Sequence, residues 1–220
     1  MRERTSICGL EFERDPKSRG QIAWGARRQF PHLPCNNSEP ADVTILATPD
    51  QPSEAQTKAL QGFLENEQAT CESMLDATLR WCRYTYDEQP GFSYFRLIEQ
   101  EPPRDVDELC GMVDFSFAFV MPLEHCGVAL IGFGFGCDWD DEHGLGIVTH
   151  DGKTLHVGQQ DEVASRCWTG IPDAICTAEE LVAKTEVLAA LLHMCPPIIN
   201  PFTGESMPAS SIMNNPFPPE

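Results

Sequence analysis

The stretch VDFSFAFVMPLEHCGVALIGFGFGC, residues 113–137, decides the fold because it holds two strand patterns joined by a short connection. Over residues 113–121, large apolar side chains alternate with other residues, and this period of two predicts a strand with one buried face. The side chains expected on that face are Val113, Phe115, Phe117, Phe119 and Met121. Residues 128–137 repeat the pattern and predict a neighbouring strand. Its inward side chains are Ala129, Ile131, Phe133, Phe135 and Cys137.

Gly132, Gly134 and Gly136 occupy the other face of the second strand. Glycines weaken a strand unless another part of the molecule approaches them closely. We therefore expect a helix or strand to pack against this glycine strip, with a ligand as the alternative. The GxGxG spacing does not indicate a phosphate loop, because it lies inside a strand and neither a helix nor GK[ST] follows it.

Residues 145–158 (LGIVTHDGKTLHVG) predict a hairpin, because the dipeptide DG at 151–152 suits a two-residue type I′ turn. With a two-residue turn, His150 lies opposite Lys153 and His156 lies opposite Ile147. Paired residues share a sheet face, so His156 and His150 are expected on opposite faces of the sheet. We therefore expect the two histidines not to share a metal ion.

Ser53 opens the strongest helix pattern in the chain, since it follows Pro52 and forms an SxxQ capping box with Gln56. The helix is expected to run to about Tyr86 as one element. Apolar residues recur along it at three- and four-residue steps and make one continuous stripe that can cover a sheet. That stripe consists of Leu60, Phe63, Leu64, Cys71, Met74, Leu75, Leu79 and Cys82.

The remaining signals complete the expected fold. Residues 43–47 (VTILA) predict a short strand, and Thr177 with Glu180 forms a TxxE capping box before a helix to about Met194. The fold class is α+β: an antiparallel β-meander packed by one long amphipathic helix, with a C-terminal helix and a Pro-rich tail. The expected units are a basic N-terminal segment with short strands at 1–42, an α+β core domain at 43–160, and a C-terminal helix and tail, packed on the core or partly disordered, at 161–220.

Charge restricts the function of the chain. Its 220 residues include 34 acidic and 15 basic side chains, for a formal net charge of −19. Binding to nucleic acid or to an anionic membrane needs clustered Lys and Arg, so neither is expected. No apolar run approaches the roughly 20 residues of a membrane helix. An acidic surface instead suits a basic protein partner or divalent cations.

The cysteine pattern argues against zinc-knuckle and redox motifs. None of the ten cysteines forms a CxxC pair, and most are expected to be small buried hydrophobic residues. The N-terminal stretch MRERTSICGLEFERDPKSRG has no apolar core followed by a cleavage site. We therefore expect no secretory signal, a cytoplasmic location and reduced thiols.

One cluster could carry chemistry, the loop DWDDEHG at residues 138–144. Its candidate binding residues are Asp138, Trp139, Asp140, Asp141, Glu142 and His143. Carboxylates at this density raise one another's pKa, and a divalent cation would relieve their repulsion. The metal-ligand candidates are Asp138, Asp140, Glu142 and His143. The loop does not match the calcium-binding template, whose last position needs Glu where this chain has Thr149.

Three interpretations of the loop stay open: it binds a metal or another ligand, it recognises a protein, or its residues only build the turn. In the last case Asp138 and Asp140 form Asx bonds, and Trp139 packs over the glycine strip. Glu142 and His143 are then hydrogen-bonded at the start of the next strand. The chain has no HExxH and no GxSxG, so no catalytic residue is assigned.

These residues resemble a known family. Residues 132–158, GFGFGCDWDDEHGLGIVTHDGKTLHVG, are similar to the GFEFGCxWDxEHGLGV strand–loop–strand motif of a family of bacterial domains of unknown function. The helix opening SEAQTKALQGFLENE is similar to that family's long helix, so the resemblance covers about residues 43–160. It implies an α+β domain with an antiparallel sheet, and no reaction. The family motif has an acidic residue at the third position of GFEFG, where this chain has Gly134. This difference removes one metal-ligand candidate.

Domains of this kind are similar to small acidic proteins found around bacterial polymorphic-toxin and immunity loci. The acidic sequence predicts a non-enzymatic acidic protein-binding domain, and the resemblance implies as one form of it a domain that acts in the manner of a toxin-immunity protein. The alternative is a divalent-metal-binding protein or metal-dependent enzyme centred on the DWDDEH loop. No cofactor is expected, apart from a divalent cation in that alternative.

Overall fold

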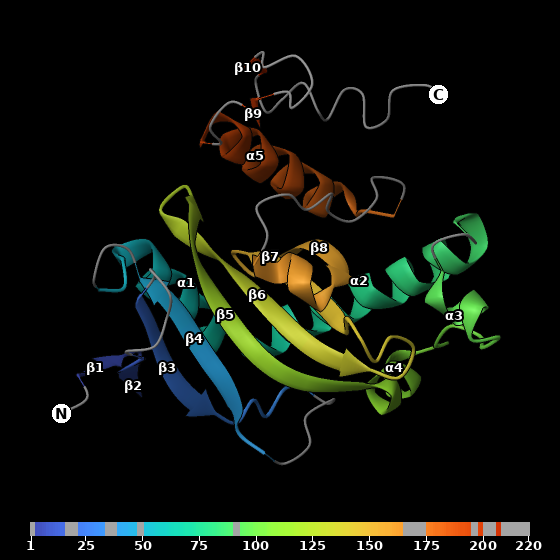
Figure 1. Ribbon diagram of the computed structural model, residues 1–220, viewed down its shortest axis with the longest axis horizontal. Coiled ribbons are helices and arrows are strands. Elements are labelled where there is room, and N and C mark those ends of the chain that lie inside the picture. The colour runs from blue at the N-terminus through green and yellow to red at the C-terminus, as the bar shows by residue number, and fades with distance from the viewer. Residues whose placement is uncertain are drawn as a thin grey trace.

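The computed structural model describes residues 3–15, 22–33, 39–47, 51–89, 93–164, 175–194, 198–199 and 206–207. The sheet strands (Figure 1) are β1 (Arg4–Ile7), β2 (Leu10–Asp15), β3 (Ile22–Arg28), β4 (Ala41–Ala47), β5 (Val113–His125), β6 (Val128–Cys137), β7 (Leu145–His150) and β8 (Lys153–Gln159). A separate pair is formed by β9 (Ile198–Ile199) and β10 (Ser206–Met207). The helices are α1 (Glu54–Glu65), α2 (Glu67–Glu88), α3 (Tyr94–Leu97), α4 (Val106–Met112), the 3₁₀ helix η1 (Gln160–Ala164) and α5 (Ala178–Met194).

The sheet is mixed, so the predicted antiparallel meander is wrong. Its eight strands follow their sequence order, and neighbouring strands are antiparallel except β4 and β5. In this parallel pair Asp42 lies opposite Phe117, and Ile45 lies opposite Val120. Parallel neighbours need a long crossover connection, and the segment between them supplies it with α1 to α4.

The predicted single long helix is also wrong, because the chain forms two helices that meet at Asn66. The start is as expected: Ser53 Oγ accepts the Gln56 amide at 3.1 Å, and Gln56 Oε1 accepts the Ser53 amide at 3.0 Å. At Asn66 the backbone leaves helical geometry (φ −121°, ψ 28°), and the side-chain amide bonds to the last turn of α1. Such local bonding competes with helix propagation. Directly after the break, buried Glu67 accepts a hydrogen bond from Arg28 at 2.9 Å, which anchors the start of α2.

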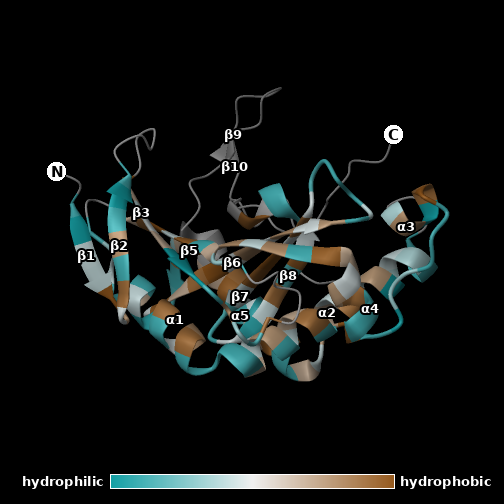
Figure 2. Cartoon of the chain, turned by 90° about the horizontal axis from the view of Figure 1, so that it is seen from below, coloured by the Kyte–Doolittle hydropathy of each residue, from teal (hydrophilic) through white to brown (hydrophobic). Residues whose placement is uncertain are grey.

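The main core lies between one face of the sheet and the helices α1 and α2. Figure 2 shows apolar residues concentrated between these helices and the sheet. The inward residues predicted for β6 are all buried there, which confirms that part of the pattern. The Phe63 ring from α1 meets Phe133 edge-to-face at 5.1 Å between centroids, a favoured aromatic geometry.

The side chains of β5 divide between the two faces of the sheet, so the prediction that all five share one face is wrong. A register irregularity lies between Phe115 and Phe117. Phe115 belongs to the main core, whereas Phe119 and Met121 pack in a second cluster on the other face. A bulge adds one residue to a strand and so reverses the alternation beyond it.

The second face of the sheet is covered by η1 and α5, which contribute Val163 and Val187 to that cluster. Side chains of η1, including Val163 and Gln160, lie directly over the glycine strip. A Cβ atom would collide with η1 at Gly132, Gly134 and Gly146. The strip therefore serves close packing, as expected, while Gly136 at its end is exposed.

The hairpin of β7 and β8 forms at the predicted turn, where residues 151 and 152 have φ values of 49° and 75°. A register shift next to Val148 pairs His156 with Val148 instead of Ile147. Paired residues share a sheet face, and Val148 shares its face with His150 by the alternation of β7. The expectation that the two histidines lie on opposite faces is therefore wrong.

The predicted TxxE capping box begins α5. The Glu180 amide donates to Thr177 Oγ1 at 3.2 Å, and Glu180 Oε2 accepts the Thr177 amide at 2.7 Å. Arg80 of α2 donates to the same Glu180 carboxylate at 2.7 Å, which ties α5 to α2. The Pro-rich tail lies outside the described residues except for β9 and β10. None of the described helices combines the length and apolarity that crossing a membrane requires.

The close packing of η1 and the end of β8 on the glycines of β6 and β7 predicts that one added methyl group has different effects at different glycines. Gly146→Ala places a Cβ against the Gln159 carbonyl and 2.7 Å from Val163 Cγ2, so we expect a loss of about 1–3 kcal/mol in the free energy of unfolding. Gly136→Ala meets no atom within 4 Å and is expected to change it by less than about 0.5 kcal/mol. Urea denaturation measures the free energy of unfolding of both variants. Equal denaturation midpoints for Gly146→Ala and Gly136→Ala would contradict the role of Gly146 in close packing.

Candidate functional site

The loop at 138–144 leaves the sheet at the end of β6 and returns as β7. The Asp138 amide donates to the Met112 carbonyl at the end of α4, at 2.9 Å. The Gln160 amide of η1 donates to the His143 carbonyl at 3.1 Å. These bonds tie the loop to two neighbouring elements, so its side chains project from a fixed backbone.

Asp140 organises this loop from the inside. Its side chain is only 6% exposed, and Oδ1 accepts both the His143 amide at 3.0 Å and His143 Nδ1 at 3.1 Å. Its carbonyl accepts the Gly144 amide at 2.9 Å. Gly144 has φ +63°, and a Cβ there would lie 2.5 Å from the Phe135 carbonyl, so the position favours glycine. Asp140 thus makes the Asx-type bond that the turn-building interpretation of the loop predicts for it.

Trp139 fills the space beneath the loop. It is 4% exposed, and its ring lies 4.9 Å from the Phe95 ring of α3, centroid to centroid. The expectation that it packs over the glycine strip is wrong, because η1 already covers that strip. Trp139 instead holds α3 against the loop.

The four predicted metal ligands do not converge. Asp138 and Glu142 are exposed, whereas Asp140 and His143 bond to each other. Within the described ranges, no group of three or more His, Cys, Asp or Glu side chains could hold a metal ion. Of the candidate set, the structure therefore brings together Asp140 and His143, and it places Asp138, Asp141 and Glu142 on the surface.

The electrostatics of the loop centre on His143. The hydrogen bond that His143 donates to the Asp140 carboxylate raises the pKa of His143 above its usual value, against a smaller opposing effect of burial. The charges of Asp140, Glu142 and Asp161 raise this pKa further. Burial raises the pKa of the nearby Cys137 thiol to about 12, which leaves it protonated and unreactive at neutral pH. The loop therefore offers carboxylates and an imidazole, but Cys137 is no nucleophile.

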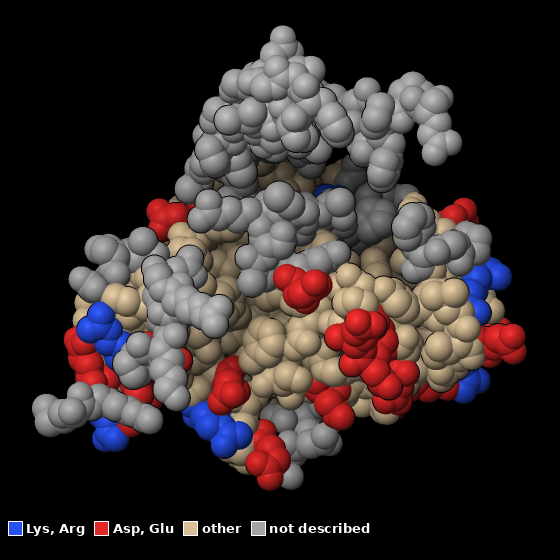
Figure 3. All heavy atoms as spheres, in the orientation of Figure 1, with Lys and Arg blue, Asp and Glu red and all other residues tan. Residues whose placement is uncertain are grey.

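The sequence did not point to Asp161, which is exposed on η1 and acts electrostatically on His143. Only the packing of η1 on the sheet brings this carboxylate to the loop, so no local pattern could have found it. We call Asp138, Asp141, Glu142 and Asp161 the acidic loop surface. Figure 3 shows acidic side chains gathered near the end of β6, with Lys and Arg mainly toward the margins of that face.

Comparison with known proteins gives a family but no activity. A family model described as "Domain of unknown function (DUF6985)" matches residues 11–164. The chain belongs to this family. The match confirms the resemblance to a family of domains of unknown function. The matched residues of this DUF6985 domain run from β2 through η1. No curated protein and no solved structure gives a significant match.

The bond between Asp140 and His143 predicts a specific pH dependence in this DUF6985 domain. The pKa of His143 is raised above 6.5 in the folded state, so the protonated imidazole stabilises that state. This contribution is complete below pH 6.5 and is lost as the pH rises through the folded-state pKa. We expect Asp140→Asn to lower the His143 pKa toward 6.5.

Nuclear magnetic resonance titration of the His143 ring measures this pKa directly in the wild-type protein and in the Asp140→Asn variant. His32→Gln serves as the control for a histidine outside the loop and should leave the His143 titration unchanged. Identical His143 titration curves in the wild-type and Asp140→Asn proteins would show that the bond does not set the pKa.

Proposed function

We propose that this DUF6985 domain is a non-enzymatic binding domain whose acidic loop surface recognises a basic protein. The observation that carries the proposal is the rigid presentation of exposed carboxylates. Asp140 and Trp139 are buried and fix the loop from below, while Asp138, Asp141 and Glu142 face solvent from it. A fixed surface loses little conformational entropy when a partner binds.

The charge of the whole chain supports the same proposal. A net charge of −19 attracts a basic partner over a distance, and complementary charge raises the association rate more than the final affinity. The resemblance to proteins of immunity loci implies one form of such a partner, a basic toxin that this domain would neutralise. Association of this kind weakens as salt screens the charges.

Affinity capture from a lysate of the source organism tests the proposal. The full chain should retain a basic protein at about 0.1 M salt and release it at about 1 M, where the screening length falls to roughly 3 Å. The variant Asp138→Asn, Asp141→Asn, Glu142→Gln should lose most of this capture, because it removes the charges of the loop.

A matched control neutralises three exposed carboxylates of α2 instead, with Glu72→Gln, Asp87→Asn and Glu88→Gln. It has the same net charge as the loop variant and should retain the partner. Equal losses in both variants would indicate a general charge effect, and capture unaffected by the loop variant would place the interface elsewhere. Either result contradicts the proposal.

A further inference from the structure

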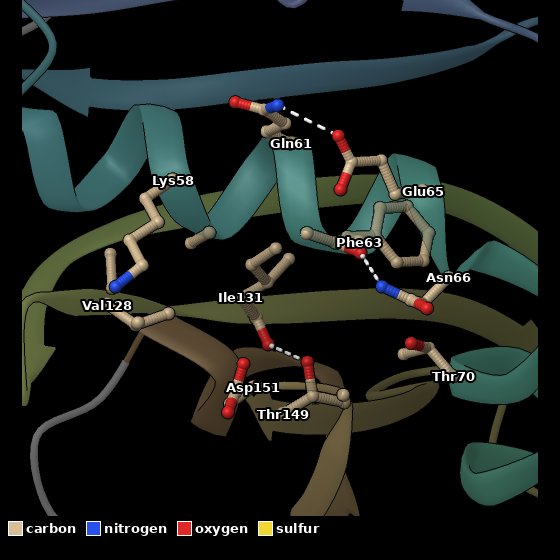
Figure 4. A pocket seen from close by; sticks show the side chains of 14 residues that line it. Lys58, Gln61, Phe63, Glu65, Asn66, Thr70, Val128, Ile131, Thr149 and Asp151 are labelled. Atoms are coloured by element: carbon tan, nitrogen blue, oxygen red, sulfur yellow. Dashed lines mark hydrogen bonds between the residues drawn. The ribbon is translucent and has the colours of Figure 1, made fainter.

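A cavity of about 350 Å³ lies between α1, the start of α2 and the strands β6 and β7, at the opposite end of β6 from the acidic loop surface (Figure 4). Its volume falls within the range of about 300–1,000 Å³ that small-molecule sites occupy. Phe63 of α1 and Val128 and Ile131 of β6 give it an apolar floor. The cavity is therefore large enough for one small ligand with an apolar body.

Thr70 places a buried hydroxyl without a partner on the wall of this cavity. The residue is 2% exposed, and its Oγ1 has no hydrogen-bond partner in the described structure. Figure 4 shows Thr70 on the α2 side of the cavity, and its Oγ1 lies close to Gly152 of the turn that carries Asp151. A buried polar group without a hydrogen bond destabilises the fold, so a ligand that bonds to it would gain affinity.

Two oppositely charged side chains, both exposed to solvent, also line the cavity. Lys58 extends from α1 toward Val128, and Asp151 comes from the turn between β7 and β8 (Figure 4). Neither side chain forms a hydrogen bond or ion pair with another described residue. The remaining charged side chain of the lining, Glu65, already accepts a hydrogen bond from Gln61 at 2.8 Å.

We propose that this cavity binds a small zwitterion, a free amino acid. Its carboxylate pairs with Lys58, its ammonium group pairs with Asp151, and its side chain crosses the apolar floor to bond Thr70. A simple anion would leave Asp151 unpaired, a simple cation would leave Lys58 unpaired, and an apolar molecule would satisfy neither charge. This site goes beyond the proposed protein binding and does not depend on it.

Calorimetric titration of the full chain with four amino acids tests the chemistry. L-Glutamine and L-tyrosine carry a hydrogen-bonding group at the end of the side chain, whereas L-methionine and L-phenylalanine are similar in size and lack a strong one. We expect the first pair to bind more tightly. Acetylation of the amine or amidation of the carboxylate should weaken binding about fivefold each, as expected for losing one partly exposed ion pair.

Variants separate binding from folding. Thr70→Val should raise the melting temperature of the free protein, because it removes the unpaired hydroxyl, and should still weaken binding of L-glutamine and L-tyrosine. Lys58→Gln and Asp151→Asn should each weaken all four ligands about fivefold. The control variants Arg27→Gln and Asp42→Asn break an exposed ion pair of 3.3 Å outside the cavity and should leave the affinities unchanged.

Three results would overturn the proposal of an amino-acid site in this cavity. Absence of saturable binding up to about 10 mM, roughly tenfold above a millimolar dissociation constant, would exclude an amino-acid site. Equal affinity for the zwitterion and its two blocked forms would reduce the cavity to an apolar pocket. Binding that Lys58→Gln, Asp151→Asn and Thr70→Val all leave unchanged would place the ligand elsewhere on the chain.

Discussion

The parallel pairing of β4 with β5 is the constraint on which the rest of the structure depends. Two parallel neighbours cannot be joined by a tight turn, so the chain must cross the sheet between them and brings its main helices to one face. Gln56 secures the start of this crossover. Its buried side chain accepts the Ser53 amide and donates to the carbonyls of Leu46 at 2.6 Å and Met121 at 3.0 Å. One amide group thus joins the helix cap to both parallel strands, near the end of β4 and within β5.

The break between α1 and α2 has consequences for both stability and binding. Buried Glu67 follows it and accepts hydrogen bonds from Arg28 at 2.9 Å and from the His32 amide at 3.0 Å. A buried carboxylate needs such partners, and removing one of them would leave an uncompensated charge. Asn66 at the break and Thr70 in the first turn of α2 also line the cavity. The feature that ends the continuous helix therefore contributes to the space in which a ligand could bind.

Local signals were sufficient to predict much of the fold, and long-range contacts account for most of the errors. The two capping boxes, the DG turn and the inward face of β6 depend on residues close in sequence, and all were predicted correctly. The parallel pairing and the bulge near Phe117 depend on partners far along the chain. The same division holds at the loop: the Asp140 bond is local, whereas the Trp139 contact with Phe95 and the approach of Asp161 require η1, α3 and the sheet to pack first.

The strand β6 links the two candidate sites, because each lies at one of its ends. Its odd-numbered residues from Ala129 to Cys137 lie in the main core, and Gly132 and Gly134 pack against η1, so most of the strand is buried on both faces. Close-packed side chains resist displacement, since moving them opens gaps and strains neighbours. Both the acidic loop surface and the cavity are thus held by the same rigid strand. A ligand or partner at either end would meet a preformed surface, and its affinity would depend on the chemistry of the exposed groups more than on folding of the site.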